Sequence, residues 1–230
     1  RVMDAVDVAR RPAQSAPGIA TQDLTDARLQ VAAWGTPVED LALLDAPPAG
    51  TWEAAGQSLS SLGAIDEAGA ATALGRTLAS LPLDPPLGRA LLASSALLGA
   101  SKAARFVALL AEDVRVPGAD LGAFERRLGR GGASGASGAH AQAARVKETQ
   151  ARLERLAKRL SASSTADALT SVTARQDAQG RTREDELALT CALAYPEWIA
   201  RRRPGSMAYI LAGGVGAELP QGSPLEGQEW

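Results

Sequence analysis

Apolar residues in the first part of the chain recur every three or four positions, the spacing of helices that bury one face. The pattern predicts helices over residues 24–34, 36–44 and 50–62, and glycine or proline follows each of them closely. Residues 64–72 form two short extended runs around Gly69, which predicts a small hairpin. Three helices and a hairpin are the parts of a winged helix. The expected core contains Trp34, Trp52, Leu59 and Leu62.

A second helical pattern begins at Asp84, which suits a helix N-cap, and Pro85 and Pro86 suit the first turn. Apolar stripes predict core helices on both sides of Gly99 and a long helix over residues 139–161. Before the long helix, residues 129–138 hold Gly and Ser with almost no large side chain, a composition typical of a flexible loop. A further helix is expected over residues 184–200, where Pro196 would kink or end it.

These elements predict a mainly α fold in which a winged helix is followed by a helical bundle. We assign residues 24–83 to the winged helix and 84–180 to the bundle, with a flexible Gly/Ala loop near residues 129–144. Strand-like runs near residues 207–211 and 215–219 predict a truncated β-containing segment within residues 181–230. Residues 1–23 are expected to be a linker or the tail of a preceding domain. The region 10–22 is rich in Pro, Ala and Gln and is expected to form a loop.

Composition narrows the choice of fold and of compartment. Hydrophobic residues make up 46% of the 230 residues but aromatics only 3%, so the core must be built from Ala, Leu and Val. Such a core favours closely packed helices over a large β-sandwich. The single cysteine, Cys191, excludes an internal disulfide framework, and we expect no metal site. No signal peptide and no run of 18 apolar residues is found, which favours a cytoplasmic location.

Candidate catalytic chemistry is sparse. The phosphate-loop pattern Gly-x-x-x-x-Gly-Lys-Ser/Thr does not occur, and Gly-rich residues 129–132 follow no predicted strand. The one histidine, His140, lies beside the glycine-rich stretch without a recognisable nucleophile, and Cys191 lies on the apolar stripe of its helix. We therefore predict no catalytic residue in this chain.

The positions of the basic residues are more informative than the net charge of the chain. That net charge is −2, from 24 Lys and Arg against 26 Asp and Glu. Residues 145–159 carry six basic side chains against Glu148 and Glu154, and Arg152, Arg155 and Arg159 share one helix face. Such a face either contacts phosphates or is simply solvated, and residues 201–203 add a second cluster of arginines. The candidate nucleic-acid-binding residues are Arg89, Lys102, Arg105, Arg145, Lys147, Arg152 and Arg155.

Five short motifs occur in the order and spacing of one family. They are VAAWG at 31–35, LDAPP at 44–48, LGAID at 62–66, TALGR at 72–76 and LPLDP at 81–85. Together they resemble the C-terminal region of DEAH-box helicases. Residues 193–196, 199–203, 209–212 and 216–220 look like the bacterial HrpB branch of that family.

The resemblance implies a winged helix followed by the ratchet bundle of an ATP-dependent helicase that moves 3′ to 5′ along RNA, or DNA. It implies RecA-like motor domains in the same polypeptide, which would use ATP and Mg²⁺, while this chain holds no cofactor of its own. The partner implied for this part is single-stranded nucleic acid, RNA more than DNA, with no membrane. The strand would be gripped by its backbone rather than read by sequence.

A second class of function stays open, because winged helices also serve as duplex readers and as protein-interaction modules. The candidate recognition helix, residues 50–62, carries Glu53 and neither Arg nor Lys, which argues against docking in a major groove. The alternative is thus a scaffold of winged helix and bundle that binds protein and has no affinity for nucleic acid.

Overall fold

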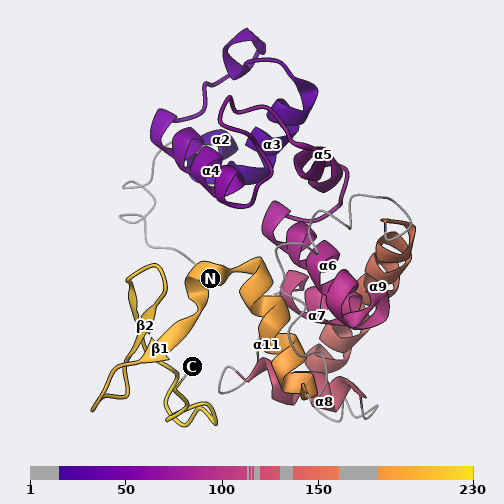
Figure 1. Cartoon of the computed structure of the whole chain (residues 1–230), viewed down its shortest axis with the longest axis vertical. Coiled ribbons are helices and arrows are strands. Elements are labelled where there is room, and N and C mark those ends of the chain that lie inside the picture. Colours follow the sequence, from indigo (N-terminus) through magenta and orange to yellow (C-terminus); the bar gives the residue numbers. More distant parts are fainter. Residues whose placement is uncertain are drawn as a thin grey trace, which may run out of the picture. The chain divides into compact units, whose positions relative to one another are not determined.

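The computed structural model describes residues 16–112, 114, 116, 120–129, 137–160 and 181–229. The chain divides into two compact units, Arg1–Ala79 and Ser80–Trp230 (Figure 1). The division lies close to the boundary that the sequence places after Leu83, and the assigned domain limits stay a prediction. The predicted mainly α fold is confirmed.

The first unit is built from short helices around a small apolar core. Leu29, Leu59 and Leu78 are fully buried in that core. Helices α3 and α4 confirm two of the three predicted helices; they pack against each other, and Leu29 and Leu59 are buried on them. The elements of this unit are α2 (Gly18–Thr21), α3 (Thr25–Trp34), the 3-10 turn η1 (Val38–Asp40), α4 (Ala49–Ser61) and α5 (Ala73–Ala79).

The predicted hairpin over residues 64–72 is reduced to one antiparallel bridge between Ile65 and Ala71. The turn between them is held by Asp66, whose carboxylate accepts hydrogen bonds from the backbone N–H groups of Ala68 and Ala70 at 3.0 and 2.9 Å. Gly69 has a φ of 81°, a conformation that suits glycine. The local turn chemistry was therefore predicted correctly, but the strands are too short to form a ladder.

The helix predicted over residues 36–44 is wrong. Only η1 forms there, and its N-cap is Pro37 rather than Thr36. Between Pro37 and Pro47 the segment is too short to repay helix nucleation, and the side chain of Leu44, part of the predicted apolar stripe, is completely exposed. The apolar period in this stretch is thus not the signature of a buried face.

The predicted core of this unit is also corrected. Leu59 and Leu62 are buried as expected, but Trp34 is 82% exposed and Trp52 is only half-buried. Trp34 is the last residue of α3, directly before the left-handed Gly35 with its φ of 82°. The helix stripe therefore ends one turn earlier than the sequence pattern indicates.

Helix α5 was not predicted. Its start is fixed by Thr72, whose hydroxyl accepts a hydrogen bond from the N–H of Gly75 at 3.0 Å. Gly75 is buried, and a Cβ there would collide with the backbone carbonyl of Ala64. This close approach of α5 to residue 64 explains a glycine that sequence rules count against a helix.

The second unit is a helical bundle in which α7 contacts both α6 and α9, and α11 packs on α6 (Figure 1). Its core is rich in Leu and Ala and includes Leu91, Phe106, Val107, Val146 and Leu153, each at most 1% exposed. The helices of this unit are α6 (Pro85–Leu98), α7 (Ala100–Ala111), α8 (Leu121–Gly129), α9 (Ser137–Leu160) and α11 (Arg183–Ala194), followed by the 3-10 turn η3 (Pro196–Trp198).

Several expectations for the bundle are corrected. Asp84 is the N-cap of α6 with Pro85 at the first turn, as predicted, although its side chain makes no capping hydrogen bond. The flexible loop expected near residues 129–144 is wrong for residues 137–144, which begin α9, while residues 130–136 lie outside the described part. Helix α8 was missed. The loop expected at residues 10–22 contains α2, and its first part, up to residue 15, is likewise not described.

After the bundle the chain forms a small antiparallel sheet, in which the strands lie in the order β1-β2-β3. The strands are β1 (Ala200–Arg202), β2 (Tyr209–Leu211) and β3 (Gly216–Ala217). Arg201 pairs with Ile210, and Tyr209 pairs with Ala217. Strands β2 and β3 lie where the sequence predicts them. Strand β1 was not predicted. The helix expected over residues 184–200 is α11, and it ends at Ala194, before Pro196, because the proline ring and its missing N–H stop the helix.

Candidate nucleic-acid interface

Helix α9 presents a basic outer face. Its apolar residues Val146, Leu153 and Ala157 are buried in the bundle core. The helical repeat therefore turns the opposite side of α9 to solvent. Four exposed cations on that outer side make no ion pair within the described part of the chain, and one carboxylate, Glu148, lies among them. The four are Lys147, Arg152, Arg155 and Arg159.

Three other predicted binding residues are committed to carboxylates of the bundle. Lys102 of α7 lies 2.6 Å from Glu186 of α11, and the Nε atom of Arg105 lies 2.5 Å from Glu125 of α8. Arg145 of α9 lies 3.4 Å from Glu112, whose carboxylate also accepts a hydrogen bond from Thr149 at 2.6 Å. The structure therefore separates the predicted set into paired and unpaired cations.

Glu125 pairs with Arg105, one of these three cations, and its position was not apparent from the sequence. The side chain is 3% exposed and lies 2.7 Å from Nη2 of Arg183 as well as next to Arg105. Arg105 also donates a hydrogen bond to the backbone carbonyl of Glu125 at 3.1 Å. A buried carboxylate between two guanidinium groups ties α7, α8 and α11 together, so Arg105 has a structural task.

Arg89 is placed differently again. It lies in the second turn of α6, it is half-buried, and its Nε atom is buried without a hydrogen-bond partner among the described residues. Arg89 therefore belongs neither to the cations paired with carboxylates nor to the exposed cations of α9. Its predicted contact with nucleic acid stays a prediction.

The arginines that follow η3 lie on or beside β1. Arg201 lies 3.3 Å from the carboxylate of Glu229, and both side chains are more than half exposed. The backbone N–H of Arg202 donates to the carbonyl of Glu229 at 2.9 Å. The second basic cluster is therefore held by a small sheet rather than by a helix end.

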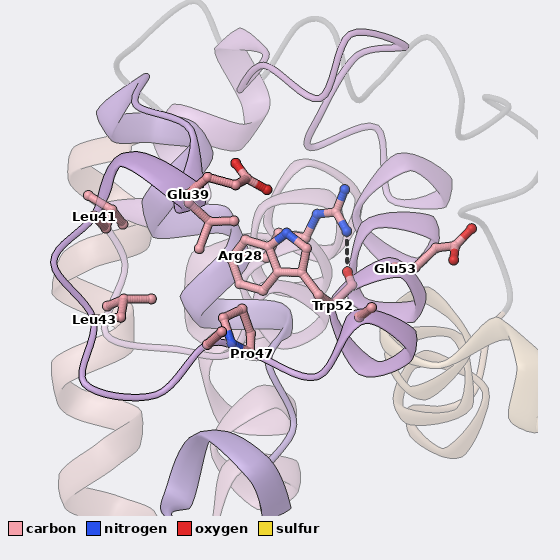
Figure 2. Close-up of a pocket in the computed structure, with 10 residues that line it drawn as sticks. Arg28, Glu39, Leu41, Leu43, Pro47, Trp52 and Glu53 are labelled. Atoms are coloured by element: carbon pink, nitrogen blue, oxygen red, sulfur yellow. Dashed lines mark hydrogen bonds between the residues drawn. The ribbon is translucent and has the colours of Figure 1, made fainter.

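A pocket of about 460 Å³ in the first unit is built around Trp52 (Figure 2). The guanidinium carbon of Arg28 lies 5.3 Å from the centre of the indole ring, and the same group donates a hydrogen bond to the Trp52 carbonyl. Gly56 makes this possible, because a Cβ at that position would collide with the guanidinium. Glu39 and Glu53 also line the pocket. With one cation and two carboxylates on its wall, the pocket is a poor site for a phosphate.

A larger groove of about 860 Å³ lies in the second unit and is mostly apolar. Burial raises the pKa of the Cys191 thiol in its wall to about 11, so the group stays protonated and unreactive at neutral pH. Burial, and then the charges of Asp84 and Glu197, also raise the pKa of Tyr195. The expectation that Cys191 is a packing residue agrees with this environment.

Other chemistry finds little support in the described part of the chain. His140 is exposed on α9, and none of the His, Cys, Asp and Glu side chains placed there gather in threes around a possible metal site. None of the described helices combines the length and the apolar character needed to cross a membrane.

Known proteins that are similar in sequence to this chain cover most of its length. The profile of the family described as helicase associated domain (HA2), winged-helix, matches residues 57–83. The ATP-dependent RNA helicase HrpB of Escherichia coli (strain K12) is 31% identical over 223 residues, which are 96% of this chain and 23% of that protein. The pre-mRNA-splicing factor ATP-dependent RNA helicase prp22 of Schizosaccharomyces pombe is 40% identical over 81 residues, 34% of this chain and 7% of that protein.

Solved structures give the same result. The E. coli DExH-box NTPase HrpB superimposes with a TM-score of 0.66 at 27% identity, over 99% of this chain and 24% of that one. A second structure, of the E. coli DEAH/RHA helicase HrpB, has a TM-score of 0.67 at 26% identity, over 99% and 25%. The chain thus spans about a quarter of the length of these helicases. In sequence and in fold it corresponds to the C-terminal region of HrpB-type DEAH-box helicases, and the resemblance drawn from its motifs is confirmed.

Proposed function

We propose that this chain is the accessory part of an ATP-dependent helicase that holds single-stranded nucleic acid, RNA rather than DNA. RecA-like motor domains of the same polypeptide would use ATP and Mg²⁺ to move 3′ to 5′ along the strand, and the winged helix and bundle would couple strand position to their closure. The relatives whose names describe them as ATP-dependent RNA helicases support this class of activity.

The observation that carries the proposal is the outer face of α9. Lys147, Arg152, Arg155 and Arg159 are exposed, and within the described part of the chain no carboxylate is paired with them. Most other cations of the bundle that the structure describes are paired, so the fold itself gives no reason for four unpaired cations on one face. Cations on one helix side neutralise a phosphate backbone without reading bases, which suits a helicase that works on any sequence.

The experiment compares binding of a fluorescent single-stranded RNA oligonucleotide to the 230-residue chain and to a variant with Arg152, Arg155 and Arg159 changed to Ala. Binding is measured by anisotropy from low to moderate salt, because the net charge of −2 makes nonspecific attraction weak. Three lost phosphate contacts should lower affinity and flatten the slope of log affinity against log salt by up to about two.

A matched control removes two cations that the bundle already uses. The double variant Lys102→Ala, Arg145→Ala changes the net charge almost as much, but both side chains are paired with carboxylates that are mostly buried, 13% and 21% exposed. Its salt slope should stay close to that of the unaltered chain. Equal losses in both variants would show that total charge rather than the α9 face governs binding, and the proposal would be wrong.

ATP chemistry is assigned to the motor domains and not to this chain. The sequence carries no phosphate-loop pattern, so the purified chain should neither bind nor hydrolyse ATP, with or without RNA. Strand-stimulated release of phosphate by the purified 230-residue chain would contradict this assignment.

The scaffold alternative is favoured by one feature of the first unit. Three large apolar side chains, Trp34, Leu43 and Leu44, are exposed there by 82%, 45% and 102%. Exposed apolar groups of this size indicate contact with other protein. In a pure scaffold the unaltered chain would show no salt-dependent affinity for the oligonucleotide even at low salt, which separates the two functions.

A further inference from the structure

The second unit carries an aromatic pair that the α9 face does not involve. Trp198 is 65% exposed at the end of η3, and its ring stacks on Tyr195 with the centroids 4.7 Å apart and an angle of 18° between the planes. Tyr195 is the more buried partner and lines the apolar groove. One side of the indole is thus supported by protein, while most of its surface meets solvent.

The backbone around Trp198 is fixed by hydrogen bonds from two directions. Its N–H donates to the carbonyl of Tyr195 at 3.0 Å, which closes the 3-10 turn. The N–H groups of Ala212 and Gly213, in the turn after β2, donate to the carbonyls of Ile199 and Glu197 at 2.8 and 3.3 Å. The ring is therefore preorganised, and a ligand that stacks on it loses little conformational entropy on binding.

Cations follow the ring on the adjoining strand. Arg201 lies in β1 and Arg203 follows the last residue of that strand, and both side chains are exposed. Arg201 is opposite Ile210 in the register, and its pair with Glu229 at 3.3 Å joins two exposed side chains. An exposed pair of this kind is worth little, so a phosphate can compete for the guanidinium.

We propose that Trp198, supported by Tyr195, is a stacking platform for one base of a single strand, whose phosphates lie on the arginines of and beside β1. The inference deepens the proposed function, on which it rests, by adding a base-contacting site to the backbone-contacting face of α9. An exposed aromatic ring followed by arginines is the combination that single-strand binders use without sequence preference. An apolar peptide would have no need of the arginines.

The test measures binding of the 230-residue chain to an oligouridine and to an abasic strand of the same length and charge. Trp198→Ala should weaken oligouridine binding about 5- to 150-fold, the range for one stacked base, and leave abasic binding unchanged. Trp198→Phe should restore most of the loss because a phenyl ring still stacks. Trp34→Ala is the control, since Trp34 is even more exposed, at 82%, but belongs to the first unit.

The outcomes separate this inference from the proposed function. If Trp198→Ala leaves oligouridine binding unchanged while the α9 triple variant weakens both strands, the platform is wrong and the α9 proposal stands. If only the tryptophan variant weakens binding, the platform stands and α9 is a solvated face. A chain that binds neither strand at low salt overturns both. Equal losses on both strands with Trp198→Ala would mean that the ring acts through structure, and would also overturn the platform.

Discussion

Two sets of basic side chains in one bundle have opposite surroundings. On α7, Lys102 and Arg105 point to carboxylates of α11 and α8 at 2.6 and 2.5 Å. On α9, Arg152 and Arg155 are exposed and have no such partner among the described residues. Both sets look alike in the sequence, where each is a cation on an amphipathic helix. The difference shows that a basic stripe becomes a candidate binding surface only where the fold supplies no acid to neutralise it.

The comparison also explains why the bundle needs its paired cations. Breaking a buried ion pair by removing one partner is costly, because the remaining charge stays in a medium of low polarity. Losing an exposed cation costs the fold almost nothing. A cation of a buried pair, such as Arg105, should therefore differ clearly from the exposed cations of α9 when stability and binding are measured on the same variants.

The largest expected effect is on Arg105. Changing Arg105 to Met leaves the carboxylate of Glu125, which is 3% exposed, with Arg183 as the one cation paired with it among the described residues. We expect the free energy of unfolding to fall by about 3 kcal/mol, at the lower end for a broken buried pair because Arg183 remains. Urea denaturation followed by circular dichroism measures this change.

A second variant keeps that prediction interpretable. Adding Glu125→Leu to Arg105→Met removes the stranded carboxylate as well, so much of the lost stability should return. A loss below about 1 kcal/mol in the single variant would mean that Arg105 is as dispensable as a surface cation. Arg105 would then return to the set of candidate strand contacts.

The next largest effect is expected at Arg28 in the first unit, where the cation stacks on an aromatic ring. Arg28 covers the Trp52 ring at 5.3 Å and donates to its carbonyl, so Arg28→Ala should cost about 1–2 kcal/mol from the lost cation–π contact and hydrogen bond. Thermal or urea unfolding of the chain reports the change. The expected loss is smaller than for Arg105 because the Trp52 site is only partly buried.

Two glycines of α4 test the same contact without removing the arginine. Gly56→Ala would push the guanidinium off the ring, whereas nothing lies within 4 Å of a Cβ at Gly50. Gly50→Ala should therefore stabilise the chain by up to about 1 kcal/mol through helix propensity, and Gly56→Ala should gain less or lose stability. Equal gains at both positions would show that Arg28 moves aside at no cost.

The sequence predicted what depends on local pattern and missed what depends on distant partners. The bounds of α3, α4 and α6 follow from apolar spacing with glycine and proline at the ends, and all three were predicted within a few residues. Helix α5 was missed because Gly75 counts against a helix, and its reason is a contact with Ala64 that no local rule contains. Trp34 was misplaced because periodicity does not show where a buried face ends.

The candidate site was predictable to a similar extent. Spacing alone placed Arg152, Arg155 and Arg159 on one face of α9, and the helix confirms that arrangement. The same reasoning could not exclude Arg105, because its partner Glu125 lies twenty residues away on α8, a helix the sequence analysis did not predict. Motif order, in contrast, identified the family, since a series of short motifs carries information that neither charge nor periodicity holds.

The smallest expected loss of stability is at Lys102. It would show that the paired cations do not all contribute equally to the fold. Lys102 lies 2.6 Å from Glu186, but its side chain is 56% exposed while that of Glu186 is 13% exposed. Water and salt screen such a pair, so Lys102→Ala should cost at most about 1 kcal/mol, and the cost should shrink as salt is raised. Urea denaturation at low and high salt measures both. A loss as large and as insensitive to salt as that of Arg105→Met would show that Glu186 behaves as a buried charge. The bundle would then hold α11 through two buried carboxylates rather than through Glu125 alone.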